Sequence, residues 1–477
     1  MADFDVYRSP FSWRYGSNEM RYIWSEINKR KLWRRIWIAL AQVESEYGFI
    51  SSSQIDELKK FADDINIDRA LQIESEIHHD LMAELLTFAE QCPNAAGVIH
   101  LGATSMDIED NADAIRIRQS VLLVLFNLKK LLLKIASFIR EWSDLPVMAF
   151  THLQPAEPTT LGYRFALYAQ DLLADWQLLE NIYRHVMGKG FKGAVGSGAS
   201  YVELIGRQNF DEFEKKLEDL LSLPFFSVSS QTYPRRQDYL VISALAGMGA
   251  TFYKLCFDLR ILQSPPIGEL SEPFGKKQVG SSAMPFKRNP IQAEKVDSLA
   301  RNLAQMPLLA WHNAAHSLLE RTLDDSANRR SLLPEAFLTC DEILRTCEKI
   351  VTGLTINAPA IQKNLALYAP FSSTERLMMA LAGAGANRQE LHAHLREHAM
   401  KAWEAVQSGK DNPLVELVSS DPDFVSHFPP EELRKMMSVE GYSGIAPKRA
   451  LEISQSIQDF FASTSDLPSF EEYNWTA

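Results

Sequence analysis

VLLVLFNLKKLLLKIASFI, residues 121–139, shows most clearly which class of fold the chain adopts. It is mostly apolar, but polar side chains interrupt it at Asn127, Lys129, Lys130 and Lys134. A membrane span needs about 20 largely uncharged residues, so we do not expect this stretch to cross a membrane. Apolar residues on several sides of one helix are typical of a helix buried inside a bundle. The stretch therefore predicts the buried helix of a soluble bundle.

Helical periodicity extends outward from this stretch in both directions. Apolar residues recur at three- and four-residue spacing, which predicts long helices, over residues 18–48, 108–142, 161–187, 235–264, 290–319 and 328–355. Strand-like alternation is nearly absent outside short pieces such as Phe225–Val228. Helices that are apolar on more than one side usually bury those sides against several partners. The pattern predicts an all-α protein and favours a bundle shared between subunits.

Breaks in the periodicity divide the chain into three predicted regions. They fall near Thr104–Asp107 and Ile356–Pro359, where turn-forming residues interrupt the helical pattern. We expect an N-terminal helical domain (1–106), a central long-helix bundle (107–356) and a C-terminal helical domain (357–477).

The overall composition and net charge limit the kind of ligand that the protein can bind. With 46% hydrophobic and 23% charged residues, the composition is that of an ordinary globular protein. A formal net charge of −12 argues against a general nucleic-acid surface. An anionic ligand would therefore need cations concentrated at one site.

The cysteines and the N-terminal residues bear on the compartment. The N-terminal segment carries Asp3 and Asp5 and lacks the apolar core of a secretory signal. The cysteines show neither CxxC pairing nor zinc spacing, which predicts reduced thiols; they are Cys92, Cys256, Cys340 and Cys347. Both observations favour a cytoplasmic location.

GSSAMPFKRNP, residues 280–290, is unusual because it places a glycine, two serines, two prolines and a Lys-Arg pair directly before a helical pattern. Hydroxyls, cations and the amide of Asn289 are groups that bind anions. Taken alone, this loop predicts an anion site.

Two segments carry histidines suited to proton transfer. EIHHDLMAELL places His78, His79 and Asp80 at a possible helix start, although a polar, solvated first turn is the favoured explanation of that segment taken alone. FTHLQPAEPTTLG (150–162) places His152 at a rigid strand-to-helix junction. Imidazole titrates near neutral pH, so His152 is either a general acid or a structural histidine bonded to a neighbouring carbonyl.

Two further segments carry oxygens or arginines suited to anions. In GATSMDIEDN (102–111) a helix cap is expected at Thr104, Ser105 and Asp107, and such a cap also presents amides and hydroxyls to a carboxylate. ERTLDDSANRR (320–330) forms either a fork for phosphate or carboxylate or a salt-bridged surface turn; its candidate residues are Arg321, Ser326, Arg329 and Arg330.

Two other patterns do not predict a site. The glycine-rich run GKGFKGAVGSGAS (188–200) lacks the Lys-Ser or Lys-Thr of a phosphate loop, so a region of tight turns is expected. His394 and His398 share a helical face near His392, but HLREH lacks the glutamate of HExxH. No metal is expected.

Together, GATSMDIEDN, THLQPAEPTT and GSSAMPFKRNP resemble the three signature segments of the fumarase/aspartase superfamily, in the same order. Within it the chain most resembles the adenylosuccinate lyase family, in its animal-type branch. Further points of resemblance are YRSPFSWRYGSNEM (7–20), the His-His-Asp-Leu-Met stretch, SSQTYPRR (229–236) and ERTLDDSANRR.

The resemblance implies an activity without a cofactor. The family eliminates fumarate from adenylosuccinate to give AMP, and also from succinylaminoimidazole-carboxamide ribotide in purine synthesis. It implies Ser281 as the base, with Ser282 as the alternative, and His152 as the general acid. Lys287 would stabilise negative charge, and His79 would be the second histidine.

Substrate-binding residues also follow from the resemblance alone. Carboxylate binding is implied for Thr104, Ser105, Gln231 and Asn289, and phosphate and ribose binding for Arg14, Tyr15, Arg321, Ser326 and Arg330. Asp80 and Ser282 belong to the same matching motifs. His78 and Lys295 stand where the family commonly has arginines. Neither side chain has the bidentate guanidinium of arginine, so weaker substrate binding is expected at these two positions.

The implied assembly is a homotetramer in which three subunits contribute to each active site. Two alternatives stand beside it: another lyase of the superfamily, such as argininosuccinate lyase, and a helical scaffold without activity.

Overall fold

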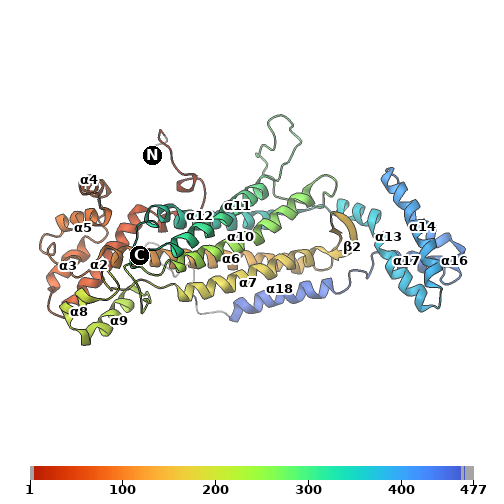
Figure 1. The fold of residues 1–477 in the computed structure, drawn as a ribbon. Helices are drawn as coiled ribbons and strands as arrows, with labels where there is room; N and C mark the ends of the chain where they lie inside the picture. Colours follow the sequence, from red (N-terminus) through yellow and green to blue (C-terminus); the bar gives the residue numbers. More distant parts are fainter. Residues whose placement is uncertain (1–4, 464–466, 468–477) are drawn as a thin grey trace.

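Helix α6 (Ser105–Glu141) contains the stretch 121–139 and runs along an elongated bundle (Figure 1). The computed structural model describes residues 5–463 and 467, apart from the side chain of Arg388. With 37 residues, α6 is about 55 Å long at 1.5 Å per residue. Five consecutive side chains, Val121–Leu125, are buried, so α6 is enclosed on all sides there. The predicted buried bundle helix is confirmed.

Four more long helices complete the central bundle. They lie close to the predicted ranges, as α7 (Leu161–His185), α10 (Arg236–Gln263), α11 (Ile291–Ala315) and α12 (Ser326–Gly353). Helix α6 packs on α7 and α12, and α10 packs on α7, α11 and α12. Among the described residues, α10 is the one helix with the length and apolar composition of a membrane span. The predicted all-α fold is confirmed.

One end of the bundle is covered by shorter helices (Figure 1). These are α1 (Asn18–Ile23), α2 (Glu26–Ser45), α3 (Ser52–Lys60), α4 (Ile67–Ile77), α5 (Asp80–Gln91), α8 (Ala199–Ile205) and α9 (Phe210–Leu221). The single helix predicted over 18–48 is wrong, because the chain breaks at Trp24–Ser25. There the Ser25 hydroxyl accepts a hydrogen bond from the Asn28 amide and starts α2.

The opposite end carries a β-hairpin that periodicity did not predict (Figure 1). Strand β1 (Pro146–Thr151) pairs antiparallel with β2 (Gln154–Thr160), with an irregularity between Met148 and Phe150. The expected strand character at Phe225–Val228 is limited to one bridge between Phe225 and Gly188. Short pieces complete the structure as η1 (Pro10–Ser12), η2 (Arg207–Asn209), β3 (Leu270–Ser271) and β4 (Thr355–Ile356).

The C-terminal helices extend the molecule beyond the hairpin (Figure 1). They are α13 (Ala358–Gly383), α14 (Arg388–Gln407), α15 (Leu414–Ser420), α16 (Pro422–Val425), α17 (Pro430–Met436) and α18 (Ala446–Ser463). The end of α13 and α14–α17 enclose a hydrophobic cluster of their own. Helix α18 instead returns along α6 and α7. The three-domain division stays a prediction, and its outer limits at residues 1 and 477 lie outside the described residues.

A buried carboxyl group gives this fold a pH dependence. The Glu44 side chain in α2 is fully buried, and neither oxygen has a hydrogen-bond partner within the described structure. Burial raises the pKa of Glu44 to about 9. The folded protein therefore keeps a proton that the unfolded chain loses near pH 4.5, so stability falls as pH rises from about 4.5 to about 9.

Replacing Glu44 with glutamine should remove this dependence. The stability of Glu44→Gln relative to the unchanged protein should increase with pH, on the order of 1 kcal/mol per unit in that window. Unfolding midpoints at pH 6, 7.5 and 9 measure the difference. Glu46→Gln is the control, because Glu46 follows Glu44 by two residues and is exposed. It should show no such trend. Parallel pH profiles for the unchanged protein and Glu44→Gln would contradict a buried neutral Glu44.

Candidate active site

A cavity of about 140 Å³ lies where the start of α12 meets the first turns of α5 and α6 and the start of α2. Five of the candidate residues line it, namely Asp80, Arg321, Ser326, Arg329 and Arg330. Arg330 Nη2 forms an ion pair with Asp80 Oδ2 at 2.8 Å, which joins the start of α12 to the start of α5. Thus two predicted segments that are 250 residues apart meet in one cavity.

His79 forms the N-terminal cap of α5, as the sequence indicated for a helix start. Its Nδ1 accepts a hydrogen bond from the Met82 amide at 3.4 Å, and its Nε2 lies 3.4 Å from the Ser105 hydroxyl. His78 ends α4 in the left-handed region (φ +55°) and is exposed. The structure therefore brings His79 and Ser105 together, whereas His78 lies in the turn between α4 and α5.

Asp107 fixes the first turn of α6. Its carboxylate accepts hydrogen bonds from the Thr104 amide at 3.0 Å and the Tyr201 hydroxyl at 3.2 Å. It is also ion-paired with Lys189, and both side chains are fully buried. Unpaired buried charges are costly, so this pairing ties Thr104 and Ser105 firmly to the glycine-rich run.

The glycine-rich run is a region of close packing, as predicted. A Cβ at Gly188 would lie 2.4 Å from Asn111 Oδ1, and one at Gly196 would lie 1.9 Å from the Ser229 carbonyl oxygen. Gly196 also has a φ of +83°, which favours glycine. The run thus brings residues 229–231 beside it, where Gln231 Nε2 donates to the Ala194 carbonyl at 3.2 Å.

A buried ion-pair network holds the arginine segment 320–330 in place. Arg235 pairs with Asp110 at 3.0 Å and with Asp325 at 2.6 Å. Arg329 pairs with Asp238 at 2.8 Å; it is buried rather than part of a surface turn, and it also lines the cavity. The motif alone did not single out Arg235, Asp110 or Asp238 for this role, because their partners are distant in sequence.

Arg321, unlike Arg329, keeps one hydrogen-bond donor that no described residue pairs with. Its Nη1 pairs with Asp325 at 2.8 Å, but its Nε is buried without a hydrogen-bond partner in the described part of the chain. Because Arg321 lines the cavity, an anion bound there would satisfy this donor. Glu109, on the same cavity, is a group that sequence reasoning missed; burial, with the nearby Asp80 and Asp113 charges, raises its pKa to about 8.

The N-terminal segment is clamped to α12 by two adjacent carboxylates. Asp341 accepts from the Ser17 amide at 2.5 Å, and Glu342 accepts from the Gly16 amide at 3.1 Å. Lys295 Nζ also pairs with Glu342, at 2.7 Å. The predicted Arg14 and Tyr15 immediately precede this clamp, so Lys295 is linked to them through Glu342.

The loop at 280–290 projects from the bundle between α10 and α11 (Figure 1). Ser281 Oγ accepts hydrogen bonds from the Met284 amide at 3.1 Å and the Ala283 amide at 3.3 Å. Asn289 Nδ2 donates to the Gly280 carbonyl at 3.2 Å and closes the base of the loop. Ser282 and Lys287 are exposed.

His152 lies in the turn of the β1–β2 hairpin, with a φ of +53° and an exposed side chain. The hairpin is at the end of the bundle opposite α3–α5 (Figure 1). Neither His152 nor Ser281 lines the cavity that contains Asp80 and Arg330. The predicted residues therefore form separate groups within one chain.

Residues 8–304 match the protein family described as Lyase, and residues 370–450 match the family described as Adenylosuccinate lyase C-terminus. The adenylosuccinate lyase of Saccharomyces cerevisiae is 38% identical over 463 residues, which cover 95% of each chain. That of Schistosoma mansoni is 40% identical over 430 residues, covering 88% of this chain and 89% of the relative. The chain belongs to the adenylosuccinate lyase family.

Solved structures agree with this family at the level of the fold. A 3-carboxy-cis,cis-muconate lactonizing enzyme from Pseudomonas putida matches with a TM-score of 0.85 at 22% identity, over 94% of this chain and 99% of the other. A fumarate lyase from Mesorhizobium sp. BNC1 matches with a TM-score of 0.81 at 23% identity, over 94% and 99%. The resemblance to the adenylosuccinate lyase family and the helical fold predicted from it are confirmed.

Proposed function

We propose that the protein eliminates fumarate from adenylosuccinate to give AMP, and from succinylaminoimidazole-carboxamide ribotide in purine nucleotide synthesis. One observation carries the proposal beyond membership of the family. Arg321, Ser326 and Arg330 line one cavity, and these groups suit the phosphate of a nucleotide. Carboxylates also line the cavity, but the buried Nε of Arg321 has no partner in the described structure and is the donor left for an anion.

The proposed reaction needs a base, an acid and a site for negative charge. Ser281 removes the proton from the carbon next to a carboxylate. The two amides that donate to Ser281 Oγ would stabilise its alkoxide, which lowers the cost of deprotonation. This supports Ser281 over Ser282 as the base. His152 then protonates the departing nitrogen.

The other predicted residues bind and polarise substrate in this proposal. Lys287 and Asn289 stabilise the negative charge that develops on the succinyl carboxylate, while Thr104, Ser105 and Gln231 hold the carboxylates. Arg14 and Tyr15 complete the phosphate and ribose end with the cavity arginines. His79 lies next to Ser105 and orients the reacting end of the substrate. The remaining contacts with the substrate come from His78, Asp80, Ser282 and Lys295. Proton transfer and charge stabilisation by side chains require no cofactor.

Argininosuccinate lyase activity is the alternative within the superfamily. A phosphate-binding cavity has no use with an amino-acid substrate, so we expect turnover of adenylosuccinate and none of argininosuccinate. Parallel spectrophotometric assays of the purified protein measure both. Activity on argininosuccinate alone would overturn the choice of substrate, and activity on neither would favour an inactive scaffold.

We also infer a homotetramer in which three subunits contribute to each site. Exposed apolar side chains follow three long helices of the bundle, and such surfaces mark protein interfaces; they include Leu167 and Leu178 on α7, Leu240 and Phe257 on α10, and Leu308 and Trp311 on α11. The separation of His152 and Ser281 from the Arg330 cavity supports the same assembly. Four buried free cysteines are compatible with the cytoplasmic location proposed here.

Mixing two inactive variants tests the shared site. If Ser281 and Arg330 of one site come from different chains, hybrids refolded from equal amounts of Ser281→Ala and Arg330→Ala should regain about one quarter of the activity. A site is intact only when the chain that supplies Ser281 is Arg330→Ala and the chain that supplies Arg330 is Ser281→Ala. Each condition holds half of the time in an equal mixture, which gives the fraction. Mixing without unfolding is the control. No recovery in confirmed hybrids would place both residues in one chain.

A further inference from the structure

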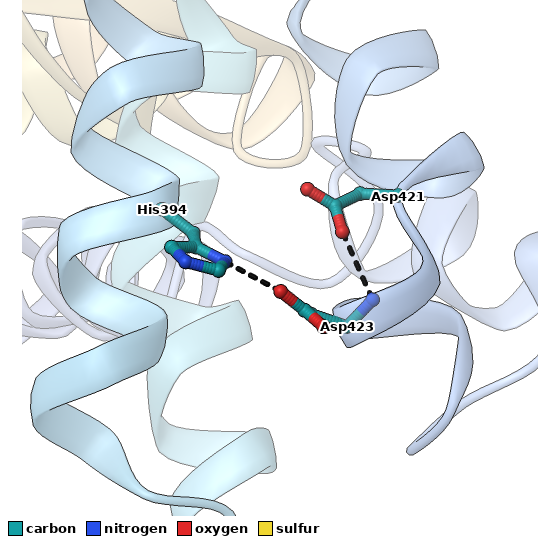
Figure 2. A group of neighbouring side chains, drawn as sticks. All are labelled: His394, Asp421 and Asp423. Carbon is teal, nitrogen blue, oxygen red and sulfur yellow. Dashed lines mark hydrogen bonds and ion pairs between the residues drawn. The ribbon is translucent and has the colours of Figure 1, made fainter.

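Outside the proposed active site, four side chains of the C-terminal region converge on the surface. Helix α14 carries His394 and His398, four residues apart, while Asp421 caps α16 and Asp423 lies within that helix. Figure 2 shows His394, Asp421 and Asp423. His394 Nδ1 lies 2.7 Å from Asp423 Oδ2, and His398 Nε2 lies 2.6 Å from Asp421 Oδ2. The reaction proposed above uses none of these residues.

The donor atoms have the composition and spacing of a cation site. One ligand atom each from His394, Asp421 and Asp423 lies within 4.8 Å of the others. A zinc ion with bonds of about 2.0 Å holds tetrahedral donors about 3.3 Å apart, so small side-chain rotations would accommodate it. Imidazole and carboxylate are both ligands that zinc accepts.

The backbone fixes the acidic half of this group. Asp421 caps α16, where its Oδ1 accepts from the Asp423 amide at 2.9 Å, so the two aspartates are held two residues apart in a defined turn. Asp421 Oδ2 lies 2.6 Å from His398 Nε2, so contacts from two elements hold this carboxylate in place.

Two separate His–Asp ion pairs are the competing explanation. They do not account for the convergence of one His394 ligand atom with carboxylate oxygens of both Asp421 and Asp423, all within 4.8 Å of one another. In metal sites the ligating carboxylates are themselves held by hydrogen bonds from neighbouring groups. His398 has that relation to Asp421, while His394 and Asp423, at 47% and 54% side-chain exposure, leave the site open to an entering ion.

We propose that His394, Asp421 and Asp423 bind one divalent transition-metal ion of the zinc class, with His398 positioning Asp421. The ion would join α14 to the start of α16, on the outside of the hydrophobic cluster formed by α13–α17. Water completes its coordination, since three protein donors leave a position open. HLREH alone did not predict this site because the two aspartates lie more than twenty residues downstream.

Zinc binding to the full-length protein tests this inference. After removal of metal with a chelator, calorimetric titration with zinc chloride should show one specific equivalent per chain, and zinc should raise the unfolding midpoint. Loss of a ligand in His394→Ala or Asp423→Asn should weaken zinc affinity at least about tenfold and remove the thermal shift. Circular dichroism would show that Asp423→Asn, the more conservative variant, keeps its fold.

Two matched controls separate this site from other surface histidines. His392→Ala changes an exposed histidine on the same helix, and the double variant His312→Ala/His316→Ala removes an exposed pair with the same spacing at the C-terminal end of α11. Both should bind zinc like the unchanged protein. Equal binding by His394→Ala and Asp423→Asn, loss of binding in either control, or binding only at millimolar zinc would overturn the proposal. Lyase activity is a separate readout and should not depend on this ion.

Discussion

Replacing Ser281 with alanine should lower kcat on adenylosuccinate by on the order of 10³-fold, with a much smaller change in KM. The hydroxyl is the proposed base, and two loop amides already donate to its oxygen. Alanine removes the only atom that those amides would stabilise as an alkoxide, while the exposed loop keeps its other contacts. Steady-state kinetics on the purified variant measure the loss.

Ser282→Ala is the matched control, because it removes an identical hydroxyl from the adjacent exposed residue. We expect it to change kcat by only a few fold. A Ser282→Ala variant that loses turnover while Ser281→Ala retains it would exchange the two assignments. Full activity in both variants would show that neither serine is the base.

Replacing His152 with glutamine should lower kcat by on the order of 10²–10⁴-fold, because protonation of the departing nitrogen would lose its acid. Glutamine can still donate a hydrogen bond but cannot deliver a proton at neutral pH. The side chain lies in an exposed turn of the hairpin, so the substitution should leave the unfolding midpoint close to that of the unchanged protein. Kinetics and thermal unfolding together separate a chemical effect from a structural one.

His185→Gln is the control for this variant. His185 is an exposed histidine at the end of α7, and its Nδ1 is engaged with the Asn181 carbonyl at 2.7 Å. It should retain the unchanged protein's turnover. If His152→Gln does so as well, the general acid is another group, and His79 beside Ser105 is the next residue to substitute.

The long helices were predictable because each carries apolar side chains in a continuous three- and four-residue pattern. Val121–Leu125 are five buried residues in a row, which within a longer helical pattern indicates a helix enclosed by its neighbours. The hairpin was not predictable in the same way. Strand β2 contains Pro155 and Pro158, and proline is normally a signal against a strand. The break at Ser25 was missed because apolar periodicity continues across it.

The candidate site was only partly visible in the sequence. Motifs marked His79, Ser105 and Arg330, but their convergence follows from packing across elements that are far apart in the chain. The ion pair between Asp107 and Lys189 carries no local signal, since its partners are 82 residues apart.

The central claim is that this chain cleaves adenylosuccinate. The most direct measurement follows fumarate and AMP released from adenylosuccinate by the purified, unmodified protein. We predict that the two products appear in a one-to-one ratio, at a rate that depends on enzyme concentration and is nearly abolished in Ser281→Ala. Absence of fumarate from a folded preparation, or fumarate released without AMP, would contradict the proposed reaction.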